Sequence, residues 1–162
     1  MQMMQFDEKG HLLPYKIIEL TLAEFEAFFV EGLDDRAHRR GLFQNYLRYL
    51  DTLKAIVSPP FFQWVGGSFV GSKRNPNDFD VVTFLDFEAH KAKEYELLWL
   101  KAQARIDWKM DGGFAFTCQS HHPMFEKSTQ TMQFWHRIFG LSREDKQNIR
   151  YPKGFIRINF IQ

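Results

Sequence analysis

The stretch from Val65 to Val81 constrains the fold of this chain more than any other segment. An apolar run ends in Gly66-Gly67-Ser68, nine residues follow, and a second apolar run opens with Asp78-Phe79-Asp80. Because side chains alternate between the two faces of a β-strand, we expect Asp78 and Asp80 on one face and Phe79 on the other. The pattern therefore predicts two β-strands joined through a glycine turn that can approach a phosphate closely, with two carboxylates beside it.

Two helices are expected before this stretch. Thr21 and Glu24 have the spacing of a capping box, in which each side chain accepts a hydrogen bond from the other's backbone, so a short helix through about Phe29 is predicted. A longer helix should begin at Asp34-Asp35 and end before Pro59-Pro60, because proline disfavours helical geometry in the residue that precedes it. Its apolar residues recur every three or four positions: Leu42, Phe43, Tyr46, Leu47, Leu50 and Leu53.

Strands and helices are expected to alternate in the rest of the chain. Strands are predicted over Phe61–Val65 and Phe79–Leu85, and a helix should run from Asp86 or Glu88 to about Gln103. The apolar face of that helix is expected to consist of Tyr95, Leu98, Trp99 and Ala102. The later segments are predicted as a strand over Arg105–Met110, a turn at Asp111-Gly112-Gly113, its hairpin partner over Phe114–Cys118, a helix over Thr129–Phe139 and a closing strand over Phe155–Phe160.

These elements predict one domain of the α/β (α+β) class, in which helices flank a mixed β-sheet. At 162 residues the chain fits a single domain, divided into a helical N-terminal part (1–58), a core (59–118) and a C-terminal helix and strand (119–162). Cys118 is the single cysteine, so no internal disulfide is expected and a reducing cytoplasm is the simplest location. No stretch is apolar enough to predict a membrane span or a signal peptide.

The paired aspartates predict a site for divalent cations. Hard cations such as Mg²⁺ prefer carboxylate oxygens, and a third carboxylate from a neighbouring strand would complete a site for two ions. Asp107 is the preferred third carboxylate, with Asp111 and Asp86 as weaker substitutes. Lys109 would share a strand face with Asp107, so an ion pair between them is the alternative explanation for Asp107.

Val65-Gly66-Gly67-Ser68 followed by Asp78-Phe79-Asp80-Val81 resembles the signature of the DNA-polymerase-beta-like nucleotidyltransferase superfamily. In that signature a hydrophobic residue, Gly, and Gly or Ser precede an acidic-hydrophobic-acidic strand. Three further segments resemble a small uncharacterised bacterial family of the same fold: Asn75–Asp78, Ile106-Asp107 and Lys153–Arg157. The resemblance implies a nucleotidyltransferase-like mixed sheet flanked by helices, dependence on Mg²⁺, and transfer of a nucleoside monophosphate from a nucleoside triphosphate.

The resemblance also implies roles for individual residues. The nucleotide-binding residues would be Gly66, Gly67, Ser68 and Lys73, with Arg74 as an alternative cation to Lys73. The catalytic and metal-binding residues would be Asp78, Asp80 and Asp107, of which Asp107 would serve as a metal ligand or as the base that takes the acceptor proton.

ATP is the expected triphosphate, and the expected acceptor is a hydroxyl group of a protein, a small molecule or RNA. Small members of the superfamily often accompany a toxin, so a toxin–antitoxin or phage-defence module with a protein partner is the expected context. The alternative is a catalytically degenerate nucleotide-binding or antitoxin-type interaction protein of the same fold. A third hypothesis, a single-stranded nucleic-acid binder that uses Arg36, Arg39 and Arg40, is disfavoured because the formal net charge is only +1.

Other polar clusters allow simpler interpretations. The basic group Arg36, His38, Arg39 and Arg40 near the start of the long helix is either a solvated helix face or a phosphate-binding site. Cys118, His121 and His122 do not have the spacing of a zinc site. His136 lies among aromatic residues and is expected to pack beside them.

Overall fold

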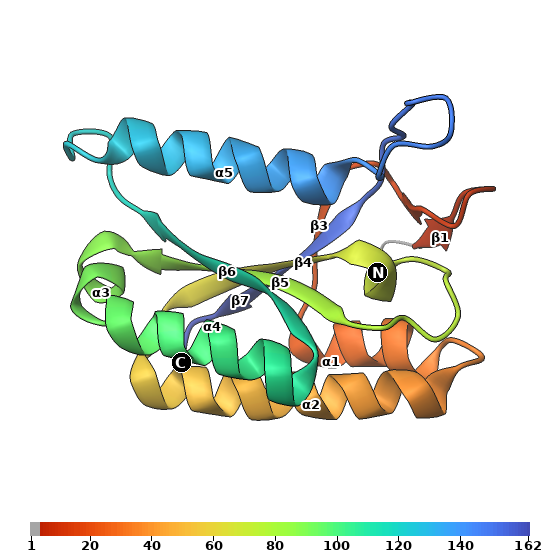
Figure 1. The fold of residues 1–162 in the computed structure, drawn as a ribbon, viewed down its shortest axis with the longest axis horizontal. Helices are drawn as coiled ribbons and strands as arrows, with labels where there is room; N and C mark the ends of the chain where they lie inside the picture. Colours follow the sequence, from red (N-terminus) through yellow and green to blue (C-terminus); the bar gives the residue numbers. More distant parts are fainter. Residues whose placement is uncertain (1–3) are drawn as a thin grey trace.

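A computed structural model describes residues 4–162, and its centre is a five-stranded mixed β-sheet in the order β3-β7-β4-β5-β6. The strands are β3 (Ile17–Glu19), β7 (Phe155–Phe160), β4 (Phe61–Gly66), β5 (Phe79–Asp86) and β6 (Met110–Thr117). Figure 1 shows the sheet between two helical layers, with α5 (Phe125–Gly140) on one face and α1 (Leu22–Glu26), α2 (Arg36–Ile56) and α4 (Glu94–Trp108) on the other. The predicted class, a mixed sheet flanked by helices, is confirmed.

The two N-terminal helices form as their capping and periodicity predict. The Thr21 hydroxyl accepts from the backbone of Glu24 while the Glu24 carboxylate accepts from the backbone of Thr21, so the capping box is confirmed. α1 continues as a π-helical turn, η1 (Ala27–Glu31), and the chain then enters α2. The face of α2 that packs on the sheet includes all the predicted apolar positions except Leu47, which is half-buried.

The N-terminal part was predicted to be helical, but it also contains three short strands. A two-stranded sheet pairs β1 (Gln5–Phe6) with β2 (Leu12–Leu13), and β3 then joins the main sheet parallel to β7. These strands are only two or three residues long, too short for an alternating pattern to identify them in the sequence. Within residues 4–162, no helix is long and apolar enough to span a membrane.

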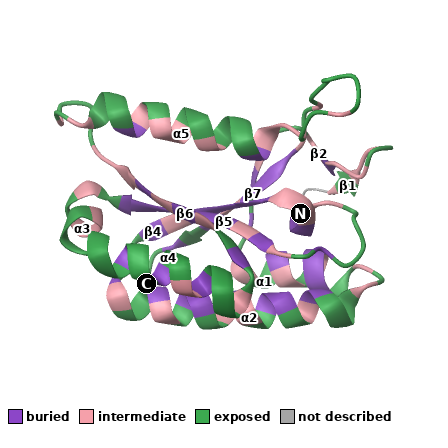
Figure 2. Ribbon diagram, in the orientation of Figure 1, coloured by how far each residue is buried: buried purple, intermediate pink, exposed green. Residues whose placement is uncertain are grey.

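The sheet separates two apolar cores, and β5 contributes to both. Phe79, Val81 and Leu85 face α1, α2 and α4 in the larger core, whereas Val82 and Phe84 face α5 in the smaller one. Figure 2 shows the buried residues concentrated along the sheet and on the helix faces turned toward it. The predicted alternation along β5 is confirmed, and it directs Asp80 to the α5 side.

The connection between β5 and β6 differs from the predicted strand and hairpin. β5 and β6 are parallel, and α3 (Phe87–Ala92) and α4 form the crossover that a parallel pair requires. The helix continues through Trp108 because Ala104 and Trp108 extend the inward face begun by Leu97 and Leu100. Lys109, in a left-handed conformation at φ 54°, ends α4, and the predicted strand over Arg105–Met110 is therefore wrong.

The glycines after Asp111 do not form the predicted turn. They lie inside β6, where Gly112 pairs with Val81 of β5. A side chain at Gly112 would overlap the Val81 carbonyl, whereas at Gly113 it would make only ordinary contacts with Trp135 and Lys101. Gly112 is thus required by the close approach of two strands, and the hairpin expected over Phe114–Cys118 is replaced by one continuous strand.

The last two predicted elements are present. α5 begins at Phe125, four residues before the predicted start at Thr129, and ends at Gly140. β7 has the predicted bounds, and its apolar face, Ile156, Ile158 and Phe160, is buried.

Candidate active site

Three aspartates converge at the α5 side of the sheet. Asp78 immediately precedes β5, Asp80 is the second residue of β5, and Asp111 is the second residue of β6, paired directly with Asp80 in the parallel register. One carboxylate oxygen from each lies within 4.8 Å of the others. Within residues 4–162, no second group of His, Cys, Asp or Glu side chains converges in this way.

Asp107, the preferred third carboxylate in the sequence, lies outside this cluster. It is an exposed residue of α4, and its carboxylate accepts a hydrogen bond from Gln103 one helical turn earlier. The alternative ion pair with Lys109 is also absent from the described residues, since Lys109 caps the helix instead. The weaker substitute, Asp111, occupies the position that was assigned to Asp107, while Asp86 caps α3 through the backbone of Glu88.

The aspartate cluster is electrostatically unfavourable by itself. Burial and the negative charges of Asp78 and Asp111 raise the pKa of Asp80 to about 7, although Lys153 and Arg143 partly oppose the shift. A divalent cation between the carboxylates would remove this repulsion, and carboxylate oxygens are the ligands that Mg²⁺ prefers. The donor set therefore fits a hard divalent cation.

The glycine turn is built around Asp80. β4 ends at Gly66, and the chain enters a short 3-10 helix, η2 (Gly67–Val70). Gly67 has φ +69°, and a side chain there would overlap the Asp80 carboxylate. Glycine is therefore needed at position 67 both for its backbone conformation and to admit the carboxylate.

A cleft of about 450 Å³ opens beside this turn. Its lining includes four of the predicted nucleotide and metal residues together with one predicted cation: Gly67, Ser68, Asp78, Asp80 and Lys73. Gly66 does not line it, because it faces the ring of Phe139 on α5, where a side chain would collide. Arg74, the alternative to Lys73, is also missing from the lining.

Arg39 holds the loop between the turn and the aspartates. This side chain is fully buried, and its guanidinium donates to four backbone carbonyls at 2.6–3.1 Å: those of Phe29, Phe69, Gly71 and Lys73. Its Nε also donates to Asp35 at 2.9 Å, and the second oxygen of Asp35 accepts from the backbone of Asn75 at 2.7 Å. The start of α2 thus positions the segment that carries one wall of the cleft.

Neither interpretation of the basic group near the start of α2 holds for Arg39, whose donors are all used inside the protein. His38 contacts the carbonyl oxygen of Pro76 through Nε2 at 2.6 Å, and Arg40 pairs with Glu31. The group is mainly a structural clamp. A run of cations in the sequence cannot reveal this, because the carbonyls that Arg39 contacts are as many as 34 residues away.

A second cleft, of about 420 Å³, lies on the other side of Asp80, between β6 and α5. Asp80 and Asp111 line it together with five cations and an aromatic side chain: Lys101, Arg105, Arg143, Arg150, Lys153 and Trp135. Asp78 lines only the first cleft, Asp111 only the second, and Asp80 both. The aspartate cluster is therefore the boundary between two compartments.

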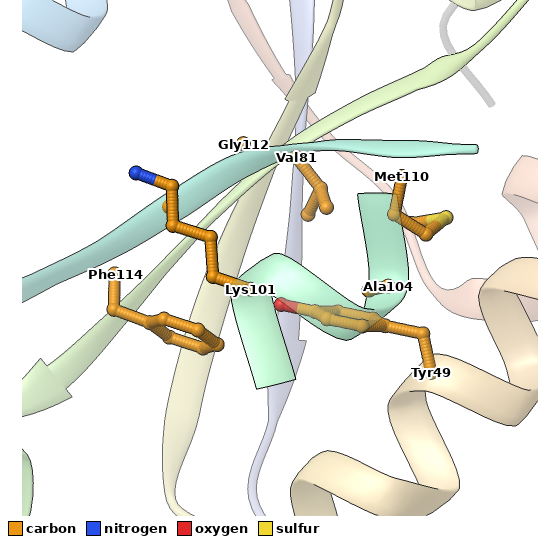
Figure 3. Close-up of a pocket in the computed structure, with 8 residues that line it drawn as sticks. Tyr49, Val81, Lys101, Ala104, Met110, Gly112 and Phe114 are labelled. Atoms are coloured by element: carbon orange, nitrogen blue, oxygen red, sulfur yellow. The ribbon is translucent and has the colours of Figure 1, made fainter. Parts of the chain in front are cut away.

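Lys101 reaches this second cleft from the far side of the edge strand. Figure 3 shows its side chain extending from α4 toward β6, above Tyr49 of α2 and beside Gly112. The side chains beneath β6 enclose only about 10 Å³, room for about one water molecule. This tight packing fixes the edge strand, and hence Asp111, against the helical layer.

None of the five cations of the second cleft was recognised in the sequence as a site residue. Lys153 and Arg143 line both clefts. Burial lowers the pKa of Lys153 below its usual value, although the negative charge of Asp80 partly opposes this shift. Lys153 belongs to one of the segments that resemble the small bacterial family, which was the only signal available in the sequence.

The remaining candidates do not form a site. Cys118, His121 and His122 belong to no metal-binding group within residues 4–162, and His122 accepts a hydrogen bond from the backbone of Met124. His136 packs edge-on against Trp64 and Phe155, as expected.

Comparisons with known proteins give the family but no activity. No curated protein and no solved structure matches the chain. One protein family, described as a family of unknown function (DUF6932), matches residues 4–159, nearly the whole length. The chain therefore belongs to the DUF6932 family.

Proposed function

We propose that this protein is a Mg²⁺-dependent nucleotidyltransferase, which moves a nucleoside monophosphate from a nucleoside triphosphate to a hydroxyl group. The observation that supports it best is the convergence of Asp78, Asp80 and Asp111 within 4.8 Å, directly beside the Gly67-Ser68 turn. A metal-binding carboxylate group next to a phosphate-sized backbone turn is the arrangement that nucleotidyl transfer requires.

The first cleft is the proposed triphosphate site. Gly67 allows the phosphates to approach the backbone, and the Ser68 hydroxyl can donate to a phosphate oxygen. Lys73 and Lys153 supply positive charge from two distant segments of the chain. ATP remains the expected triphosphate.

The three aspartates have distinct positions relative to the two clefts. Asp78 is on the triphosphate side, Asp111 is on the far side, and Asp80 borders both. When bound, two Mg²⁺ ions would neutralise the charge on the attacking and leaving oxygens. Asp111 takes the role predicted for Asp107, as a metal ligand or as the base that takes the acceptor proton.

The second cleft is the proposed acceptor site. Its cations, Lys101, Arg105 and Arg150 among them, favour an acceptor that carries negative charge near the reacting hydroxyl. Trp135 offers an aromatic surface for a flat group. The proposed acceptor is a hydroxyl of a protein, a small molecule or RNA, since all three can present a hydroxyl next to an anionic group.

The test compares nucleotide binding and label transfer in matched variants. The protein is incubated with Mg²⁺ and ATP labelled in the α-phosphate, with and without cell lysate, and ATP binding is measured separately by calorimetry. Asp80→Asn should abolish transfer, whereas Asp107→Asn, which changes an aspartate outside the cluster, should leave it intact.

The outcomes separate the proposal from its alternative. Binding of ATP without transfer to any acceptor would favour the degenerate nucleotide-binding or antitoxin-type protein. Absence of Mg²⁺-dependent binding for every nucleoside triphosphate would refute both nucleotide-based functions and leave only the antitoxin-type interaction protein.

A further inference from the structure

Helix α4 is apolar on two opposite faces, and only one of them is covered. Leu97, Leu100 and Ala104 are buried against α2 and the sheet. The outward face carries large apolar side chains at high exposure: Tyr95 at 83%, Leu98 at 62%, Trp99 at 55% and Ile106 at 78%. A helix that is apolar on both faces is normally buried on both.

The uncovered face includes all four residues predicted as the packing face of this helix, Tyr95, Leu98, Trp99 and Ala102, so that prediction is wrong. Tyr95, Trp99, Ala102 and Ile106 follow three- and four-residue spacing down one side. The chain itself packs the other side, and Figure 2 shows the outward surface of α4 as mostly exposed. A contiguous apolar stripe of this kind marks an interaction surface.

Two charged residues flank the stripe in a self-complementary way. Glu94 lies in the first turn of α4 and Arg105 in the last, eleven residues apart and therefore about three turns along the same side. Both are exposed, and neither forms an ion pair within residues 4–162. If a second helix of the same sequence packs antiparallel, Glu94 of each copy faces Arg105 of the other.

We propose that the outward face of α4 binds the same face of a second copy of this chain, with the two helices antiparallel. A two-fold axis near Trp99 places Tyr95 of one copy against Ile106 of the other, and the two Glu94–Arg105 pairs close the contact at either end. In this arrangement the stripe of each copy covers the stripe of the other, and Glu94 and Arg105 of each copy gain a partner of opposite charge. It does not depend on the proposed catalytic activity, although Arg105 also lines the proposed acceptor cleft.

The small size of the interface indicates a weak, reversible dimer. α4 has 15 residues, which gives a contact about 22 Å long. Stable interfaces bury more than about 1,000 Å² in total, and one helix pair lies near that limit. The dimer should therefore form in the micromolar range and dissociate on dilution.

The first test measures mass as a function of concentration. Sedimentation velocity of the full chain from about 1 to 300 µM should show a shift from monomer to dimer. Ile106→Glu should weaken association at least about tenfold, because it inserts a charge into the stripe. Ile161→Glu is the matched control, since both isoleucines are 78% exposed and only Ile106 lies on the stripe. Unchanged thermal unfolding of both variants verifies that the fold is intact.

The second test is a charge exchange. Glu94→Arg and Arg105→Glu, made singly, should each weaken the dimer about tenfold because like charges then face each other. The double variant should restore association to within about threefold of the natural chain. A monomeric mass at every concentration, no loss in Ile106→Glu, or no restoration in the double variant would overturn the proposal. Recovery of a different protein on this face by a monomeric chain would overturn it as well.

Discussion

Asp80→Asn should make the metal-free protein more stable at neutral and alkaline pH. Asp80 has a pKa of about 7 in the folded protein, against 3.8 for an ordinary aspartate, because it is buried beside two other carboxylates. A folded pKa above the unfolded one means that the unfolded state loses its proton first as pH rises. Stability therefore falls from about pH 4 to pH 7 and is then level.

The raised pKa of Asp80 lowers the free energy of unfolding by about 4 kcal/mol over the whole pH range. About 3 kcal/mol of this loss falls between pH 5 and pH 8. Asparagine has nearly the same shape and no charge, so Asp80→Asn should remove most of this pH dependence. Asp107→Asn should leave it unchanged because Asp107 is exposed on α4. The buffers must contain a chelator, since a bound cation would offset the same repulsion.

The assay is urea unfolding followed by tryptophan fluorescence at pH 5 and pH 8. Mg²⁺ is added at about 100 times its dissociation constant for the natural protein. It should raise the free energy of unfolding of the natural protein at pH 8 by about 2.7 kcal/mol, and that of Asp80→Asn by much less. Equal stability of the natural protein at pH 5 and pH 8 with chelator would refute the electrostatic reasoning. A Mg²⁺ effect of the same size in both proteins would show that the cation binds elsewhere.

Two further substitutions test how the site is held in place. Arg39→Ala should lower the free energy of unfolding by about 3–5 kcal/mol, because it removes a buried charge and leaves several carbonyls unpaired. Arg36→Ala, at an exposed position, should change stability little, and thermal unfolding measures both. Gly112→Ala should destabilise the protein by several kcal/mol, because the new methyl group would meet the Val81 carbonyl, and it should weaken Mg²⁺ binding by displacing β6. Gly113→Ala, with room for a methyl group, should stay within about 1 kcal/mol of the natural protein, and equal effects at the two glycines would contradict the strand register.

The local patterns in the sequence predict the elements that carry half of the site. The alternation of β5 requires only neighbouring residues, so it places Asp78 and Asp80 on one face before any long-range contact is known. The same holds for the capping box at Thr21 and for the heptad-like spacing of α2, since both depend on residues within one or two helical turns.

The sequence misleads where a local preference competes with packing. Asp111-Gly112-Gly113 has the composition of a turn, yet it lies in a strand because β5 needs a neighbour without a side chain at position 112. Arg39 belongs to a basic group that is typical of a solvated helix face, yet it is buried because the chain after the glycine turn supplies three carbonyls and Phe29 supplies a fourth. In both cases the deciding partner is far away in the sequence.

The sequence by itself therefore determined the fold class, the glycine turn and the first two carboxylates, because these follow from periodicity and side-chain alternation within single elements. Only the tertiary structure decided the third carboxylate, since the parallel register of β5 and β6 sets Asp111 opposite Asp80 and leaves Asp107 on a helix. The same is true of the cations Lys153 and Arg143, which reach the clefts from the C-terminal part of the chain. Strand register and the approach of distant segments depend on the packing of the whole domain, and no local pattern encodes them.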